Sequence, residues 1–266
     1  MEEVERYHKV VIYFFSLTGN TLKIARVIKK VLERRGLIVK LRQIKKNITI
    51  EEADVYGVGT LVMYLDIPKI VRETLSKIPK GAKVFCFITH GGVPGTALYT
   101  MTKILKKNKC TVIGAEKFVG YDSWTPYLPF KLQWGRPNEY DLKKAEYFGL
   151  KIAKMVKQKK TSEEKVKLNK LLKIFYAFLR FVQKKLLIPK IKVNKKKCRK
   201  CLICVAKCPI NAIKVVEGYP QIPESCERCY FCEKVCPSNA ISCNWTLYRI
   251  VAAFYVPLLK IYWKRR

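Results

Sequence analysis

The chain has 266 residues, enough for one large domain or two ordinary ones, and its hydrophobic fraction of 49 % is normal for a protein with a core. Its 54 Lys and Arg against 20 Asp and Glu give a formal net charge of +34, and residues 151–200 alone carry 19 basic and 2 acidic side chains. A field this positive favours an anionic partner: an acidic protein, an anionic lipid surface or nucleic acid. The N-terminal MEEVERYHK is charged and has no apolar core, so we expect no signal peptide and a cytoplasmic protein.

Residues 1–160 alternate between strand and helix patterns, which predicts an α/β fold with a doubly wound, five-stranded parallel sheet. The predicted strands are 9–15, 37–44, 53–62, 82–89 and 110–119, and the predicted helices are 21–36, 66–78, 95–108 and 139–158. Such sheets bind ligands at the carboxyl ends of their strands.

The first strand is followed by SLTGNT, residues 16–21, at the start of the first helix. Ser16, Thr18 and Thr21 offer hydroxyl groups, Gly19 lets the backbone come close, and a helix N-terminus presents free N–H groups. This composition suits a phosphate. It matches neither the P-loop nor the dinucleotide-binding glycine pattern, and an ordinary capped turn is the alternative.

At these residues the chain resembles flavodoxins, whose [ST]-x-T-G-x-T loop SLTGNT fits, and the resemblance covers about residues 8–158. It implies FMN, with its phosphate held by Ser16, Leu17, Thr18, Gly19, Asn20 and Thr21. It also implies that two later loops surround the flavin ring. Their candidate residues are Thr60, Met63 and Tyr64 after the third strand, and Thr89, His90, Gly91 and Gly92 after the fourth.

Two of these ring contacts have plain alternatives. Tyr64 could stack on the flavin or be a half-buried loop aromatic, and His90 could hydrogen-bond the flavin or be an ordinary loop histidine. The acidic residues that classical flavodoxins place around the flavin are missing here. The aromatic-rich loop 121–137 is a candidate lid or interdomain pad.

Residues 161–192 form a basic connector in which an amphipathic helix is predicted over 168–190, ended by Pro189. The C-terminal segment 245–266 also mixes cations with aromatic and aliphatic residues. The lysines of the connector and Pro257 argue against a membrane span. The apolar faces of both segments are expected to pack between the domains, with peripheral contact to an anionic membrane as the alternative.

A cysteine-rich domain is predicted over 193–244, where 8 of the 11 cysteines form two clusters, which indicates metal ligation rather than disulfides. CRKCLICVAKCPINAI (198–213) and CERCYFCEKVCPSNAI (226–241) match at half of their positions with a period of 28. Each contains C-x2-C-x2-C-x3-C-P. Such a repeat predicts a small pseudo-twofold domain stabilised by its metal.

These motifs resemble those of bacterial-type ferredoxins with two 4Fe-4S clusters, over about 50 residues. In that family the fourth cysteine of each motif ligates the other cluster. The resemblance therefore implies one cluster on Cys198, Cys201, Cys204 and Cys236, and a second on Cys226, Cys229, Cys232 and Cys208. Structural zinc is the alternative, but it has no use for a third cysteine at this spacing. We expect Cys86 and Cys110 to be buried, and Cys243 to be a spare thiol.

Together the two modules resemble the flavodoxin–ferredoxin fusion family. The resemblance implies electron transfer between FMN and two 4Fe-4S clusters, with a redox partner protein that has an acidic surface. The alternative is a flavin-dependent oxidoreductase acting on a quinone- or porphyrinogen-like substrate. Nucleic acid is not expected as a partner, because no nucleic-acid-binding motif is present.

Overall fold

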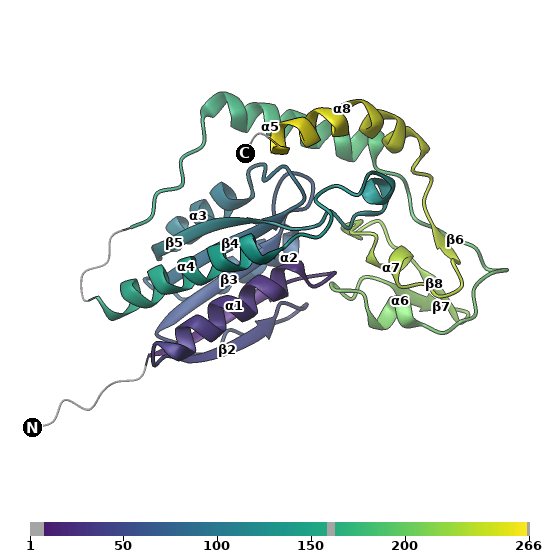
Figure 1. The fold of residues 1–266 in the computed structure, drawn as a ribbon. Coiled ribbons are helices and arrows are strands. Elements are labelled where there is room, and N and C mark those ends of the chain that lie inside the picture. Colours follow the sequence, from purple (N-terminus) through teal and green to yellow (C-terminus); the bar gives the residue numbers. More distant parts are fainter. Residues whose placement is uncertain (1–7, 159–162, 265–266) are drawn as a thin grey trace, which may run out of the picture. The chain divides into compact units, whose positions relative to one another are not determined.

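The computed structural model describes residues 8–158 and 163–264, and its internal contacts divide the chain into two units (Figure 1). Unit 1 comprises residues up to 121 together with 133–176, and unit 2 comprises 122–132 together with residues from 177 onward. The loop segment 122–132 lies within the predicted first domain, yet it belongs by its contacts to unit 2. Outside the described residues lie 161–162 of the predicted connector and 265–266. Residues 1–7, where no signal peptide is expected, also lie outside them.

Unit 1 contains a five-stranded parallel sheet with the strand order β2-β1-β3-β4-β5 (Figure 1). Its strands are β1 (Lys9–Phe15), β2 (Ile38–Gln43), β3 (Val55–Leu61), β4 (Lys83–His90) and β5 (Thr111–Val119). This order is that of the flavodoxin-like doubly wound fold, so the predicted fold class is confirmed. Because all five strands run the same way, the loops after β1, β3 and β4 meet at one edge.

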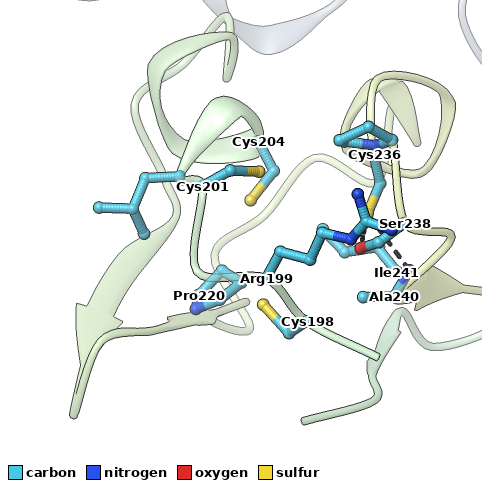
Figure 2. A pocket seen from close by; sticks show the side chains of 11 residues that line it. Cys198, Arg199, Cys201, Cys204, Pro220, Cys236, Ser238, Ala240 and Ile241 are labelled. Atoms are coloured by element: carbon cyan, nitrogen blue, oxygen red, sulfur yellow. Dashed lines mark hydrogen bonds between the residues drawn. The ribbon is translucent and has the colours of Figure 1, made fainter. Parts of the chain in front are cut away.

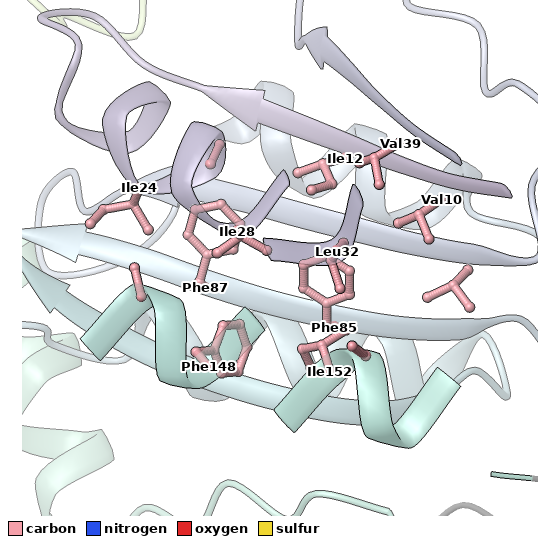
Figure 3. Close-up of a cluster of buried hydrophobic side chains, with 14 of the residues drawn as sticks. Val10, Ile12, Ile24, Ile28, Leu32, Val39, Phe85, Phe87, Phe148 and Ile152 are labelled. Atoms are coloured by element: carbon pink, nitrogen blue, oxygen red, sulfur yellow. The ribbon is translucent and has the colours of Figure 1, made fainter. Parts of the chain in front are cut away.

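The helices of unit 1 are α1 (Asn20–Arg34), α2 (Lys69–Lys77), α3 (Ala97–Lys107) and α4 (Glu139–Lys157). Helix α1 packs with α4, and α2 packs with α3. Between the α1–α4 pair and the sheet lies the main core, where Ile24 and Ile28 of α1 meet Phe85 and Phe87 of β4 (Figure 3).

Two glycines of β3 make room for this core. A Cβ on Gly57 would lie 2.5 Å from the ring of Phe85, and one on Gly59 would lie 2.2 Å from the ring of Phe87. Side chains at either position would displace these buried rings. The close approach of β3 and β4 keeps the two loops that follow these strands near each other.

Unit 2 is built around the two cysteine motifs, and each motif lies between two short strands. Strands β6 (Lys192–Val193) and β7 (Lys214–Val216) flank the first motif, and β8 (Tyr219–Gln221) and β9 (Ile241–Ser242) flank the second. They pair antiparallel as β6–β9 and β7–β8. Each motif also contains one helical turn, α6 (Ile203–Ala206) or α7 (Phe231–Lys234). This is the arrangement of a pseudo-twofold domain.

The remaining helices lie outside the repeat. Helix α5 (Lys170–Val182) runs from unit 1 into unit 2 and continues as a π-helical turn, η2 (Gln183–Leu187), that ends before Pro189. A 3-10 helix, η1 (Thr125–Phe130), forms in segment 122–132, and α8 (Thr246–Lys264) forms the C-terminal segment. Over the described ranges, no helix is both long enough and apolar enough to cross a membrane.

Candidate cofactor sites

The two cysteine motifs repeat in backbone conformation as well as in sequence. Three positions in each motif adopt the left-handed conformation, and the members of each pair are 28 residues apart. The pairs are Lys200 and Arg228 (φ 53° and 54°), Leu202 and Tyr230 (55° and 58°), and Asn211 and Asn239 (47° and 49°). Left-handed residues let the chain coil tightly, so that cysteines spaced two residues apart can turn their thiols to one side. For residues other than glycine this conformation costs free energy, which suggests that a bound group stabilises it.

The first three cysteines of motif 1 share a pocket with the last cysteine of motif 2. The thiols of Cys198, Cys201, Cys204 and Cys236 surround the same space, and the Arg199 side chain extends across it in this view (Figure 2). The other four cysteines also lie near one another: Cys208 is close enough to Cys226, Cys229 and Cys232 to interact electrostatically with each of them. The structure thus brings the cysteines together in the two crossed groups that the ferredoxin resemblance implies.

The protein supplies hydrogen bonds to several of these sulfur atoms. The Sγ of Cys208 accepts from the N–H of Ala212 at 3.3 Å, and the Sγ of Cys236 accepts from that of Ala240, 28 residues later, at 3.2 Å. Burial raises the pKa of Cys236, but hydrogen bonds, first from the Ile241 backbone and then from the Ser238 side chain, outweigh it and leave the pKa below its usual value. Donors of this kind stabilise a thiolate, the form in which cysteine binds iron.

The chemistry of the donor set fits 4Fe-4S clusters, because each group offers four thiols. In the part of the chain that the structure describes, no three His, Cys, Asp or Glu side chains are placed to hold a single metal ion. Cys86 and Cys110 are buried in unit 1, as expected. Cys243 lies beside motif 2, where its N–H donates to Glu233 Oε1 at 3.0 Å.

An aromatic cluster covers the second motif within unit 2. Its members are Trp124, Tyr127, Tyr230, Trp245, Tyr248 and Tyr255. Tyr230 follows Cys229 directly; its hydroxyl donates to the Pro189 carbonyl at 2.6 Å, and its ring packs edge-on to Trp245 with centroids 4.5 Å apart. Burial raises the pKa of the Cys229 and Cys232 thiols to about 12.

Polar contacts also join α7 to Trp245 of the aromatic cluster and to segment 122–132. The indole N–H of Trp245 donates to both carboxylate oxygens of Glu233, at 3.2 and 3.1 Å. The ammonium group of Lys234 donates to the carbonyl of Ser123 in segment 122–132. The sequence showed 121–137 and 245–266 to be rich in aromatic residues, but no local signal indicated that both segments pack on motif 2.

Motif 1 has no comparable cover among the described residues. Cys201 and its neighbours Arg199 and Lys200 are exposed, and so are the apolar side chains of Leu202 and Ile203. Lysines surround this half: Lys195 and Lys200 lie over the ring of Tyr219, 5.2 and 4.4 Å from its centroid. The first cluster site is therefore open, apolar at its mouth and positively charged at its rim.

In unit 1, loop 16–21 forms the turn expected of a phosphate site. Gly19 has a φ of 96°, which L-residues rarely adopt, and its N–H donates to Ser16 Oγ at 3.2 Å. No side chain caps the N-terminus of α1 at this glycine, and the first turn of the helix has no acidic residue. Free N–H groups at a positive dipole end, hydroxyl groups and an open backbone fit the FMN phosphate.

The three predicted flavin loops are joined at the carboxyl edge of the sheet. The hydroxyls of Thr21 and Thr89 lie 2.7 Å apart and are buried, and the N–H of Val62 donates to the Thr89 carbonyl at 2.9 Å. The N–H of Thr96 donates to the Leu65 carbonyl at 2.8 Å. A fourth segment joins them, because the side chain of Asn20 donates to the Tyr121 carbonyl at 2.9 Å.

The individual ring candidates differ in their surroundings. Thr60 is buried, with its hydroxyl donating to the Leu61 carbonyl at 3.0 Å, and Tyr64 is only 8 % exposed and has a positive φ. Met63 and Gly91 are half-buried, and Gly92 is buried. Stacking of Tyr64 on the flavin stays a prediction, since the ring is already largely surrounded by protein.

His90 is a buried, neutral imidazole. Burial, followed by the nearby ammonium groups of Lys117 and Lys144, lowers the pKa of His90 to about 3. Its Nδ1 accepts the N–H of Gly92 at 3.2 Å, so the ring proton is on Nε2. His90 thus holds the turn of the loop after β4.

Comparison with known proteins identifies two kinds of domain in the chain. Residues 10–120 match the model of the flavodoxin domain, and residues 191–214 and 219–242 match that of the 4Fe-4S binding domain. No curated protein matches the chain.

Several solved structures are similar to it. A flavodoxin from the domain Archaea is 19 % identical with a TM-score of 0.45, and the match covers 56 % of this chain and 99 % of that one. Megasphaera elsdenii flavodoxin is 21 % identical with a TM-score of 0.42, covering 55 % and 98 %. Rubredoxin oxygen:oxidoreductase from Desulfovibrio gigas is 22 % identical with a TM-score of 0.43, covering 56 % and 36 %. From its two kinds of domain match, the chain consists of an N-terminal flavodoxin domain and a C-terminal 4Fe-4S ferredoxin-type domain with two cluster motifs.

Proposed function

We propose that the protein transfers electrons between FMN in unit 1 and two 4Fe-4S clusters in unit 2, and exchanges single electrons with a partner redox protein. The observation that carries this proposal is the crossed grouping of eight cysteines in a chain that also has a flavodoxin domain. A flavin can exchange electrons in pairs or singly, whereas each cluster passes one at a time.

Each cofactor has its protein ligands. Cys198, Cys201, Cys204 and Cys236 hold the first cluster, and Cys226, Cys229, Cys232 and Cys208 hold the second. Residues 16–21 would hold the phosphate of FMN, and the loops after β3 and β4 would hold the ring. The role of the chain is to position the cofactors, to supply N–H donors to thiolate and phosphate, and to exclude water from one of the clusters.

The partner docks at motif 1. Electron transfer between proteins requires close approach of the cofactors, and among the eight cysteines of the motifs only Cys201, in the first group, is exposed. The exposed Leu202 and Ile203 offer an apolar contact within a rim of lysine and arginine. A complementary partner has an acidic rim around an apolar centre.

The alternative, activity on a quinone- or porphyrinogen-like substrate, has two sequence features in its favour: the aromatic loop 121–137 and the basic, apolar connector. We do not adopt it, because Trp124 and Tyr127 of this loop are packed in the aromatic cluster of unit 2.

A pair of glycine substitutions tests the proposal. Gly19 and Gly36, at opposite ends of α1, both have positive φ and open space where a Cβ would be. Gly19→Val should abolish FMN binding and leave the iron content unchanged, whereas Gly36→Val imposes similar backbone strain away from the loop and should retain FMN. In the unmodified protein, photoreduction of the flavin should bleach the cluster absorption. FMN retained by Gly19→Val, or clusters that stay oxidised after photoreduction of the unmodified protein, would contradict the proposal.

A further inference from the structure

Helix α8 has apolar side chains on two faces. One face, with Tyr248, Ala252 and Val256, is buried within unit 2. The other is exposed and follows a helical spacing of three and four residues. We call it the α8 stripe; its members are Leu247, Ile250, Phe254, Leu258 and Ile261. Phe254 is 78 % exposed and Leu258 67 %, so this stripe is a continuous apolar surface rather than a few scattered side chains.

Helix α5 is also apolar and unburied. None of its 13 residues is buried. Its large exposed side chains are Leu171, Leu172, Ile174, Phe175, Phe178 and Phe181. The turn that continues α5 adjoins α8 within unit 2, because the amide of Gln183 donates to the Tyr248 hydroxyl at 2.7 Å.

The sequence segments that form these helices carry charges of one sign. Residues 165–216 contain 16 Lys and Arg and no Asp or Glu, and residues 234–266 contain no Asp or Glu either. The α8 stripe and the apolar side chains of α5 therefore lie in sequence segments whose formal charges are all positive. Helices that lie flat in a lipid interface have this composition, with apolar side chains among the acyl chains and cations near anionic headgroups.

We propose that the protein docks on the surface of an anionic lipid bilayer through the α8 stripe, with the exposed apolar side chains of α5 as a second contact. Charge favours an anionic bilayer over a second copy of the chain, because a second copy would place its own cations next to those of the first and the two would repel each other. The proposal does not depend on electron transfer, since neither helix contributes a cysteine ligand.

Flotation of the full-length, cluster-loaded protein with lipid vesicles tests this docking. The protein should float with vesicles of phosphatidylglycerol and phosphatidylcholine at low salt and be released by high salt. It should bind little to phosphatidylcholine alone. The double variant Phe254→Ser, Leu258→Ser should reduce partitioning roughly tenfold or more, because both apolar groups would leave the interface. A matched control, Tyr140→Ser with Tyr147→Ser on the exposed face of α4, should bind like the unmodified protein.

Three results would overturn the proposal. One is no flotation with anionic vesicles. Another is flotation that the α8 substitutions leave unchanged while iron content shows an intact fold. The third is a dimer in sedimentation that the same substitutions dissociate, without vesicle binding, which would identify a second copy as the occupant.

Discussion

Leu202 and Tyr230 occupy the same position in two copies of one motif, with φ of 55° and 58°, yet Leu202 is 37 % exposed and Tyr230 only 2 %. Their neighbours differ in the same way. Motif 2 lies under the aromatic cluster, whereas motif 1 is surrounded by exposed cations. The local pattern of cysteines sets the backbone of both halves, and distant segments decide which half solvent reaches.

Under the proposed function, this difference would give the two similar sites separate tasks. The covered half would serve stability and keep water from its cluster, and the open half would serve exchange with a partner. Substitutions at equivalent positions of the repeat are therefore natural controls for one another.

The largest expected effect is that of removing the iron. Cys204 and Cys232 belong to the small apolar core of unit 2 together with Ile213 and Ile241, so loss of both clusters should unfold this unit. Limited proteolysis and circular dichroism of the iron-free protein should show unit 2 digested and unit 1 intact. Cys229→Ser, in the covered half, should destabilise unit 2 more than Cys201→Ser. A protease-resistant, iron-free unit 2 would contradict this.

Truncation of the equivalent residues Tyr230 and Leu202 should have unequal effects. Tyr230→Ala removes a buried ring with its hydrogen bond to Pro189 and should lower the free energy of unfolding of unit 2 by roughly 3 to 5 kcal/mol. Leu202→Ala should cost less than about 1 kcal/mol because its side chain is already exposed. Anaerobic chemical unfolding, followed through the cluster absorption, measures both. Equal costs would show that the aromatic cover contributes nothing to stability.

Asp122, the first residue of segment 122–132, should make the free energy of unfolding of unit 2 depend on pH. Burial, only partly opposed by the Trp124 N–H and by Lys234, raises the pKa of Asp122 to about 7. The folded form then binds this proton more tightly than the unfolded chain, so the stabilisation is complete below about pH 4 and is lost as the pH rises through about 7.

Asp122→Asn should remove this slope and gain up to roughly 4 kcal/mol at about pH 8, measured by unfolding between about pH 5 and 8. Glu224→Gln, at an exposed position of the same unit, should not change the slope. A slope that survives in Asp122→Asn would assign it to another group.

The smallest expected effect concerns the positive charge around motif 1, the exposed half of unit 2. Lys196→Glu with Arg199→Glu should slow electron transfer to an anionic acceptor, the cobalt(III)–EDTA complex, by a few fold, and should speed transfer to cobalt(III) hexammine. Lys80→Glu with Lys107→Glu in unit 1 changes the net charge equally and should have less effect. Stopped-flow kinetics at low and high salt compare the pairs, and equal effects would place the exchange site elsewhere.

Features that depend on residues close together in the sequence could be predicted, whereas those that depend on contacts between distant segments could not. Buried runs such as residues 9–15, and the cysteine spacing, are local signals, so the sheet and the motifs could be predicted from the sequence. The burial of Tyr64 and His90, and the partners of Trp124 and Trp245, depend on segments far apart in the chain. For the same reason, the sequence placed 122–132 with the first domain, although its contacts are in unit 2.

The most direct test of the central claim is the iron, sulfide and acid-released flavin content of protein purified without oxygen. The proposed ligands predict about eight iron, eight sulfide and one FMN per chain. Iron and sulfide without FMN would contradict the role proposed for loop 16–21, and zinc in place of iron would contradict electron transfer altogether.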